Sequence, residues 1–260
     1  VGGNAIAAAD LANVTAIETF QVVGTTANAD ITLNNANGAD GETLTINASS
    51  LTTGVLTLNA TSDTDANIVV IGGAGADIIT GSASDLGDNL SGGLGADTFN
   101  FATANLTLLD TIAGGDGTDI LSLSDDNTVV DADFTLVTSV ETLTAAADID
   151  STITLGALAS AAGIATVTLT GEAAGDTDTL TVGAGFTSAL TVNLDDDANT
   201  ANTVNAAAYT GVLTINAGDD ELDTTASTLT GGTGTSDVLA ITVGGNAIAA
   251  ADLANVTAIE

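Results

Sequence analysis

Three segments that follow one pattern decide the fold of this chain: GGAGADIIT at residues 72–80, GGLGADTFN at residues 92–100 and GGDGTDILS at residues 114–122. Each fits G-G-x-G-x-D-x-U-x, in which U is a large apolar residue. A related segment, GGTGTSDVLA at residues 231–240, carries one inserted residue. One glycine-rich loop would mean little, whereas three full matches within about fifty residues are a strong signal for a repeat architecture.

The residue types in this pattern favour a calcium-binding turn. Glycines allow positive φ angles, so the chain can turn tightly with carbonyl oxygens pointing at one centre. The aspartate adds a hard anionic oxygen, and calcium takes six to eight such oxygens in flexible geometry. The turns begin 20 and 22 residues apart (92 − 72 and 114 − 92), which predicts one coil between them. We therefore expect the turns to stack along one edge, with calcium between Asp77 and Asp97 and between Asp97 and Asp119.

The predicted metal-binding residues are the glycines and aspartates of these turns and two further aspartates: Gly72, Gly73, Gly75, Asp77, Gly92, Gly93, Gly95, Asp97, Gly114, Gly115, Gly117, Asp119, Asp88 and Asp237. On the opposite edge, GSASDLGDNLS from residue 81 could use Asp85 or Asp88, and Asp116 could be a ligand or a solvent-facing residue. Other acidic turns are interpreted mainly as solvated: Asp40 and Glu42, Asp63 and Asp65, Asp176 and Asp178, Asp195 to Asp197, and Asp219 to Glu221.

The composition combines strong acidity with many apolar residues. The chain has 34 Asp plus Glu and no Lys, Arg or His, so a compact fold repels itself unless cations bind. Nucleic acid is excluded as a partner because its phosphates would meet like charge. Hydrophobic residues make up 45%, which argues against disorder, and there is no Cys to form a disulfide. The scarcity of aromatic residues predicts an aliphatic core built from many short strands.

Strand–turn–strand units recur through the chain, as in LTINASSLTTGVLTLNA at 44–60, LTVGAGFTSALTVNL at 180–194 and TVNAAAYTGVLTINA at 203–217. Apolar residues alternate with Thr in these units, which is the period of a strand with one buried face. We predict an all-β fold, a parallel β-solenoid or β-roll. Short helical corners are expected at 4–17 and 131–140, where apolar residues recur at a spacing of three.

The sequence also repeats at a longer period. Residues 1–18 and 243–260 both read VGGNAIAAADLANVTAIE, so the period is 242 residues (243 − 1). A weaker duplication relates GGTGTSDVLAIT and ADLANVTAIETFQV to GGDGTDILSLS and ADFTLVTSVETLT. We therefore divide the chain into a first half-unit at 1–113, a second at 114–230, and the start of a further repeat at 231–260. Repetition at both scales favours a stack of coils over a closed globule.

These motifs resemble the RTX family of calcium-binding repeats of bacterial type I secreted proteins. The alternation of such turns with Thr-, Ala- and Asn-rich strands and V-x-x-[IV]-E-T segments is similar to RTX-type surface-layer proteins and giant adhesins. The resemblance implies a parallel β-roll that folds on meeting extracellular calcium, with Asp77, Asp97 and Asp119 as ligands. It implies a location outside the cell or at the bacterial cell surface.

The expected function is structural, and we expect no enzymatic activity. Catalysis lacks a His or Lys base, a Cys nucleophile and an Arg to hold an anion. The expected partners are copies of the same module, with cell-surface polysaccharide bound through regions outside this segment. No apolar stretch reaches the length of a transmembrane helix. The alternative is a ligand- or ice-binding module that uses outward-facing rows of Thr.

Overall fold

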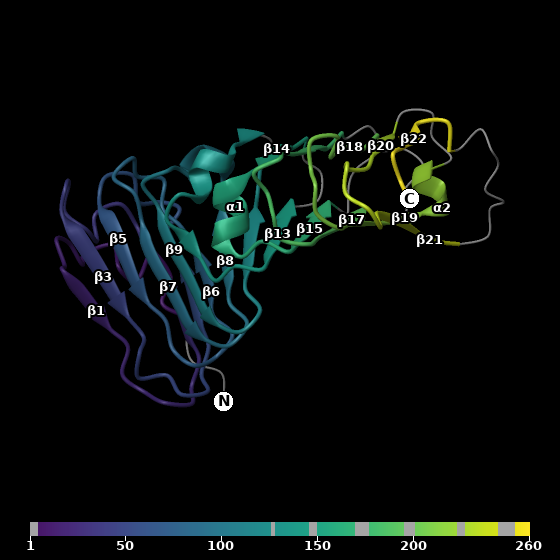
Figure 1. Cartoon of the computed structure of the whole chain (residues 1–260). Coiled ribbons are helices and arrows are strands. Elements are labelled where there is room, and N and C mark those ends of the chain that lie inside the picture. The colour runs from purple at the N-terminus through teal and green to yellow at the C-terminus, as the bar shows by residue number, and fades with distance from the viewer. Residues whose placement is uncertain are drawn as a thin grey trace. The chain divides into compact units, whose positions relative to one another are not determined.

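The computed structural model describes residues 5–125, 128–145, 150–169, 177–194, 201–222, 227–243 and 253–260. Within this part the protein is an all-β parallel solenoid with little helix (Figure 1). The contacts divide it into two units. The first is Val1–Ser122 with Thr135–Val140, and the second is Leu123–Phe134 with Glu141–Glu260. The division falls near residues 122–141, and it leaves the third glycine-rich turn, at 114–119, with the first unit.

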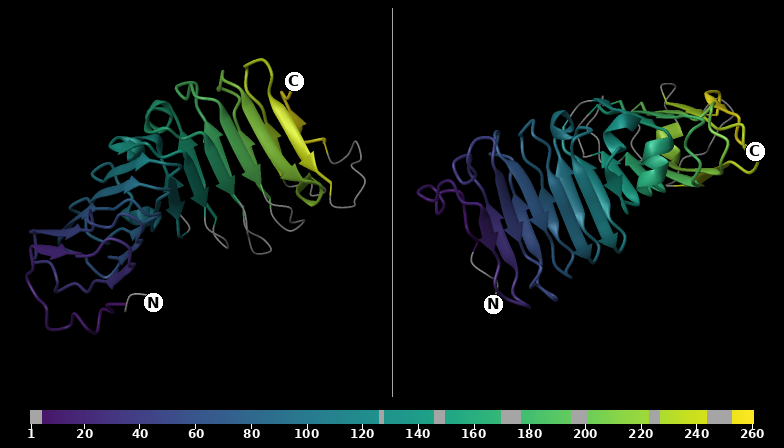
Figure 2. Two further views of the ribbon diagram at one scale, coloured as in Figure 1. Left: turned by 90° about the horizontal axis from the view of Figure 1, so that it is seen from below. Right: turned by 60° about the vertical axis from the view of Figure 1, so that its left-hand side comes forward.

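The first unit consists of two parallel sheets whose strands alternate along the chain. The strands lie side by side in the order of the coils, as the blue and teal strands of Figure 2 show. One sheet has β1 (Thr19–Gln21), β3 (Thr43–Asn47), β5 (Asn67–Ile71), β7 (Asn89–Leu94), β9 (Thr111–Asp116) and β12 (Val137–Thr138). The other has β2 (Ala29–Thr32), β4 (Leu56–Asn59), β6 (Ile78–Thr80), β8 (Thr98–Phe101) and β10 (Ile120–Leu123).

The second unit repeats this plan with two further rows of parallel strands. One row has β11 (Thr128–Val129), β14 (Thr152–Leu155), β16 (Thr179–Val182), β18 (Thr203–Asn205), β20 (Thr228–Thr230) and β22 (Val256–Thr257). The other has β13 (Thr142–Ala145), β15 (Thr166–Leu169), β17 (Leu190–Leu194), β19 (Leu213–Gly218) and β21 (Val238–Thr242). Paired residues lie between 20 and 27 positions apart, as in Ile78↔Thr98 and Ala29↔Leu56, so each coil contains that many residues.

The predicted alternation of buried and outward residues is confirmed. In β3, Leu44 and Ile46 are fully buried, whereas Thr45 between them is only half-buried. The same pattern holds in β4, β16, β17 and β19, so one aliphatic residue from every coil stacks on the next. The core of each unit is therefore a set of in-register aliphatic columns. Burial of these columns, at about 25 cal/mol per Å² of apolar surface, is the main favourable contribution to folding.

The helical corners were predicted only in part. The 3-10 helix η2 (Asp131–Phe134) confirms the second predicted corner, but residues 5–17 form hydrogen-bonded turns instead of a helix, with Asp10 N–H donating to Ala7 O at 2.9 Å. The sequence did not predict η1 (Thr103–Asn105), α1 (Ala157–Ala162) or α2 (Asp219–Leu222).

Helix α1 escaped prediction because its cap comes from another coil. The Asp131 carboxylate accepts hydrogen bonds from the backbone N–H groups of Gly156 and Ala159 at the start of α1, at 2.8 and 2.9 Å. A carboxylate at a helix N-terminus satisfies N–H groups that have no partner within the helix. Gly163, with φ of 110°, ends the helix. Nothing in the local sequence of α1 points to a cap 25 residues away.

Candidate metal centre: the aspartate ladder

The aspartates of the three glycine-rich turns form one hydrogen-bonded column, which we call the aspartate ladder: Asp77, Asp97 and Asp119. The backbone N–H of Asp77 donates to Asp97 Oδ1 at 2.7 Å, and the N–H of Asp97 donates to Asp119 Oδ1 at 2.7 Å. All three side chains are fully buried. The predicted stacking of these turns along one edge is therefore confirmed, and each carboxylate bonds to the coil before it.

Asp77 shows what the carboxylate does within its own turn. Its Oδ2 accepts from the N–H of Gly73, at 2.8 Å, while its Oδ1 accepts from the N–H of Leu56 in the preceding coil, also at 2.8 Å. The aspartate thus closes the turn and joins two coils. Hydrogen bonds to a charged acceptor are roughly twice as strong as neutral ones, so this arrangement stabilises the corner.

Asp237 repeats this arrangement in the second unit, in the turn that carries an inserted residue. Its two oxygens accept from the N–H groups of Gly232 at 2.7 Å and Leu213 at 3.0 Å. Ser236, immediately before it, has φ of 89°, a region that non-glycine residues rarely adopt. The extra residue is accommodated there, and the aspartate keeps its position.

The glycines of the motif are required by the close approach of backbone and carboxylate. A Cβ on Gly72 would lie 2.7 Å from Asp77 Oδ2, and a Cβ on Gly92 or Gly114 would overlap the carboxylate of its own turn. The later glycines face carbonyls of the coil before: a Cβ on Gly93 or Gly95 would overlap the O atom of Gly73 or Gly75, one on Gly115 or Gly117 that of Gly93 or Gly95, and one on Gly75 that of Gly54, while on Gly73 it would meet Leu51 O at 2.7 Å. The apolar residues of the motif, Ile79, Phe99 and Leu121, are fully buried, as predicted.

Burial disfavours the charged form of the ladder carboxylates. Loss of solvation raises the pKa of Asp97 to about 6; the neighbouring charges of Asp77 and Asp119 raise it further, and the hydrogen bond from the Asp77 N–H opposes the rise. Burial also raises the pKa of Asp77, against the hydrogen bonds from Gly73 and Leu56. Asp97 Oδ2 is buried and has no hydrogen-bond partner in the described part of the chain. At neutral pH this oxygen is an anionic site without a protein donor.

A second, shorter ladder joins Asp88 to Asp110 on another corner of the first unit. The N–H of Asp88 donates to Asp110 Oδ1 at 2.7 Å, and the Asp88 carboxylate accepts from both the N–H and the hydroxyl of Ser82, at 2.7 and 2.8 Å. Burial raises the pKa of Asp88 to about 6 and also raises that of Asp110. The sequence analysis missed Asp110, although it follows Asp88 by 22 residues, the same interval that separates Asp97 from Asp119.

A third row lies in the second unit and replaces aspartate by neutral residues. The N–H of Ser151 donates to Asp178 Oδ1 at 2.7 Å, that of Asp178 donates to Asn202 Oδ1 at 3.2 Å, and that of Asn202 donates to Ser227 Oγ at 3.2 Å. Asn and Ser therefore fill the same structural position as the ladder aspartates. The hydrogen bond to the preceding coil requires an oxygen, whereas the charge is additional.

The weaker acidic candidates divide into exposed and buried residues. Asp40, Glu42, Asp85 and Asp116 are exposed, as expected for solvated turn acids. The expectation is wrong for the three acids that the corners bury: Asp63, Asp178 and Asp219. Asp65 is half-buried, and Asn35 Nδ2 donates to its Oδ2 at 3.1 Å. Outside the described residues or side chains lie Asp176, Asp195, Asp196, Asp197, Asp220 and Glu221.

The ladder offers ligands of the type that calcium requires. An ionised carboxylate is a pure acceptor with about four lone-pair sites, so Asp97 retains acceptors even after its bond from Asp77. Among the described residues, no three or more His, Cys, Asp or Glu side chains form a metal site by themselves. A cation at Asp97 would therefore take carbonyl oxygens of the glycine turns as well, which is common for calcium.

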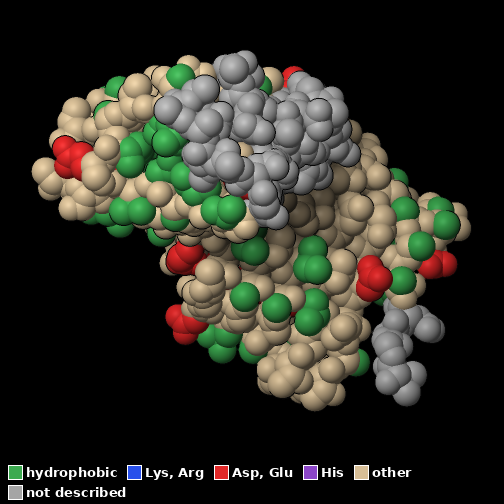
Figure 3. Space-filling model, turned by 90° about the vertical axis from the view of Figure 1, so that its right-hand side faces the viewer, with side chains coloured by type: hydrophobic (Ala, Val, Ile, Leu, Met, Phe, Trp, Pro, Cys, Tyr) green, Lys and Arg blue, Asp and Glu red, His purple; other side chains and the backbone are tan. Residues whose placement is uncertain are grey.

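No protein family, curated protein or solved structure matches this chain. In the described residues, no helix has the length and apolar character needed to cross a membrane. Figure 3 shows acidic side chains dispersed over the face in view, among uncharged polar residues and backbone.

Proposed function

We propose that this chain is a structural repeat module of a secreted bacterial surface-layer, fibre or adhesin-stalk protein, folded and rigidified by calcium at its stacked GGxGxD turns. The observation that supports the proposal most is Asp97 Oδ2, a buried anionic oxygen without a protein donor between two like-charged neighbours. Such a group needs either a proton or a bound cation.

Calcium is the cation that suits this position best. Asp97 would hold it, with Asp77 and Asp119 on either side and carbonyl oxygens from the glycine turns. Calcium supplies the positive charge that the protein lacks, since the chain has 34 acidic and no basic side chains. Extracellular modules bind calcium with Kd values of about 10⁻⁴–10⁻³ M, which matches a protein that works outside the cell.

The experiment compares thermal unfolding of the full chain in chelator, calcium and magnesium, followed by circular dichroism. At about one hundred times its Kd, each bound calcium stabilises the fold by about 2.7 kcal/mol. We expect a clear rise of the melting temperature in calcium and a smaller one in magnesium, which keeps its water ligands more firmly. Identical melting curves in chelator and in calcium would rule the proposal out.

A second candidate function, an ice- or ligand-binding face, is supported by the register of the second unit. Thr152, Thr179, Thr203 and Thr228 follow one another across neighbouring strands. A second row, two residues further on, contains Thr154, Thr181, Asn205, Thr230 and Thr257. The rows are more regular than the sequence suggested, because Asn interrupts only one of them.

An ice-recrystallisation assay tests this second function. A face that orders water needs both rows, spaced by about 4.8 Å between strands and about 6.7 Å along a strand. The wild-type chain should slow crystal growth, and Thr181→Lys in the middle of the face should abolish the effect. The control is Thr168→Lys, on the other row of strands in the same unit. Equal crystal growth with and without the wild-type chain would exclude this function.

A further inference from the structure

The segment VTAIE or its relative occurs three times, and its surroundings differ in an informative way. The three copies are residues 14–18, 137–141 (VTSVE) and 256–260. Their third residues, Ala16, Ser139 and Ala258, have φ of 52°, 52° and 54°, an unusual conformation for residues other than glycine. The three copies therefore share one backbone shape as well as one sequence pattern.

Two of the copies pack on the preceding coil in the same way. Val137 pairs with Ile112 just before the GGDGTD turn, and a Cβ on Gly114 would overlap Ser139 O. Correspondingly, Val256 pairs with Leu229 just before the GGTGTSD turn, and a Cβ on Gly231 would overlap Ala258 O. Each copy thus seats on a strand that ends in a GG turn.

The first copy packs on the following coil in the same way as the internal copy. Glu18 O accepts from the N–H of Thr45, as Glu141 O accepts from the N–H of Thr166. Upstream, Ile6 bridges to Ile31 as Val129 pairs with Ile153. Residues 5–18 therefore already have the neighbour that follows them, and the neighbour that precedes them would be a strand with a GG turn.

Side-chain burial shows the same asymmetry. In the internal copy, Val137 and Val140 are 3% and 0% exposed. Their counterparts in the first copy, Val14 and Ile17, and in the last copy, Val256 and Ile259, are only half-buried. Leu11 is 6% exposed but the identical residue Leu253 is 39% exposed, because Leu11 has a following coil against it.

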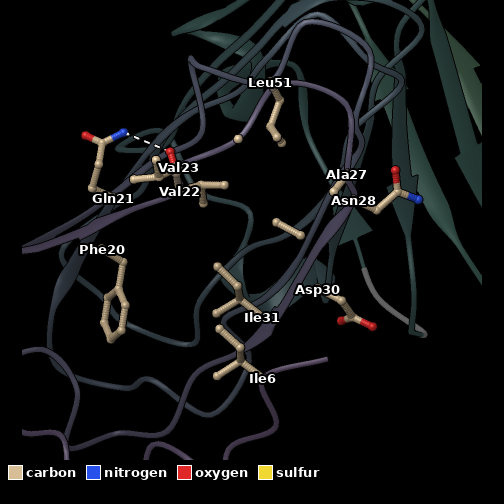
Figure 4. A pocket seen from close by; sticks show the side chains of 12 residues that line it. Ile6, Phe20, Gln21, Val22, Val23, Ala27, Asn28, Asp30, Ile31 and Leu51 are labelled. Carbon is tan, nitrogen blue, oxygen red and sulfur yellow. Dashed lines mark hydrogen bonds between the residues drawn. The ribbon is translucent and has the colours of Figure 1, made fainter. Parts of the chain in front are cut away.

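The N-terminal face has an apolar opening where the preceding coil would lie. A pocket of about 300 Å³ is lined by Ile6, Phe20, Val22, Val23, Ile31 and Leu51 (Figure 4). Val23 is 89% exposed. Strand β1 is the edge strand of its sheet, so its outer side has no strand to pair with in the described structure. Such an open apolar edge favours the addition of another coil.

We propose that this N-terminal face binds the strand and GG turn at residues 228–237 of a second copy of the chain, in a head-to-tail junction. In that junction, Val14 and Thr15 take the positions that Val256 and Thr257 occupy in the described structure. The carbonyls of Asn13 and Thr15 then accept from the N–H groups of Leu229 and Gly231, as those of Asn255 and Thr257 do at 3.1 and 2.9 Å. The proposal deepens the structural function above by naming its partner and contact, and it does not depend on calcium.

One consequence is that residues 253–260 act as a removable cap. They hold the position that residues 11–18 of the next copy would take, and being in the same chain they compete at high effective concentration. The intact chain should therefore be largely monomeric, and weakening only the C-terminal copy should start head-to-tail growth.

The test uses the full chain with paired substitutions in the two identical segments, at a calcium concentration that keeps all variants folded by circular dichroism. Val256→Asp with Ile259→Asp opens the acceptor edge, and light scattering should then show oligomers whose mass rises with concentration. The matched control, Val14→Asp with Ile17→Asp, should stay monomeric, as should the chain with all four substitutions. A monomeric opened chain, or association that persists with all four substitutions, would overturn the proposal.

Disulfide trapping provides a second readout, because the chain has no cysteine. Thr257 Oγ1 donates to Thr230 Oγ1 at 3.3 Å, so Thr230→Cys with Thr257→Cys should form a bond within one chain. In the opened chain, Thr230→Cys with Thr15→Cys should give a ladder of covalent multimers under oxidation. Absence of that ladder, while the first pair links normally, would contradict the junction even if oligomers form. Failure of calcium to stabilise the fold would leave both readouts unchanged.

Discussion

At the scale of single residues, the aspartate of each glycine-rich turn has two tasks that conflict. It must accept backbone hydrogen bonds from two coils, which an oxygen of any polar side chain can do, as Asn202 does in the second unit. It also brings a charge into a buried position beside like charges, as at Asp97. The first task stabilises the corner, and the second destabilises it unless a proton or a cation is present.

Replacing Asp97 by asparagine separates these tasks. Asp97→Asn keeps an oxygen for the Asp77 N–H and removes the buried charge, so in chelator at pH 7.5 we expect stabilisation of about 1–3 kcal/mol, seen as a rise in melting temperature. The control Asp116→Asn removes a charge from an exposed position of a neighbouring turn and should change stability by less than about 0.5 kcal/mol. A chelated Asp97→Asn chain that melts below the wild type would show that the charge is not a liability.

At the scale of elements, the turns determine which residues can form the corners. Gly115 has φ of 111°, and a Cβ there would overlap Gly93 O in the preceding coil. Gly41 also has a positive φ, 74°, but open space surrounds its Cβ position. The two glycines thus distinguish conformational strain from close packing of coils.

Alanine substitutions at these two glycines measure the packing contribution. Gly41→Ala should cost about 1–2 kcal/mol from backbone strain alone. Gly115→Ala should cost at least twice as much, because the carbonyl of Gly93 must also move and the hydrogen bonds near it weaken. Urea unfolding of both variants gives the two free energies. Equal losses at both positions would mean that the coils are less closely stacked at the turn than described.

The sequence predicted the features that repeat and missed those that depend on a distant coil. Period-2 alternation and the 20- and 22-residue intervals were sufficient for the parallel solenoid and for the stacking of Asp77, Asp97 and Asp119. They could not show that Asp131 caps α1, or that Asp63 is buried, because both depend on which corner lies next to which. Asp110 was within reach, since its interval from Asp88 repeats a known spacing.

At the scale of the whole molecule, the excess of acidic groups makes stability depend on protons and cations. The pKa values of Asp88 and Asp97 are raised to about 6 in the folded chain, above their ordinary value. The folded state therefore binds more protons than the unfolded state between about pH 4 and pH 6. The stability that these protons contribute is present below about pH 4 and is lost as the pH rises through about 6.

Without calcium, the chain should therefore be more stable at mildly acidic than at neutral pH. We expect the melting temperature in chelator to fall as the pH is raised from 4.5 to 7.5. Calcium should reduce that slope, because it replaces the protons as the counter-charge. Thermal unfolding at three pH values, with and without calcium, provides the comparison. A chelated chain that gains stability between pH 4.5 and 7.5 would contradict the raised pKa values.

The most direct test of the central claim, that the aspartate ladder is a calcium site, is equilibrium dialysis of the full chain against calcium. We compare the wild type with Asp97→Asn and the control Asp116→Asn. The account predicts that the wild type and Asp116→Asn bind the same number of calcium ions and that Asp97→Asn binds fewer, with its hydrogen-bonded corner intact by circular dichroism. Equal calcium binding by the wild type and Asp97→Asn, or no binding by either, would contradict it.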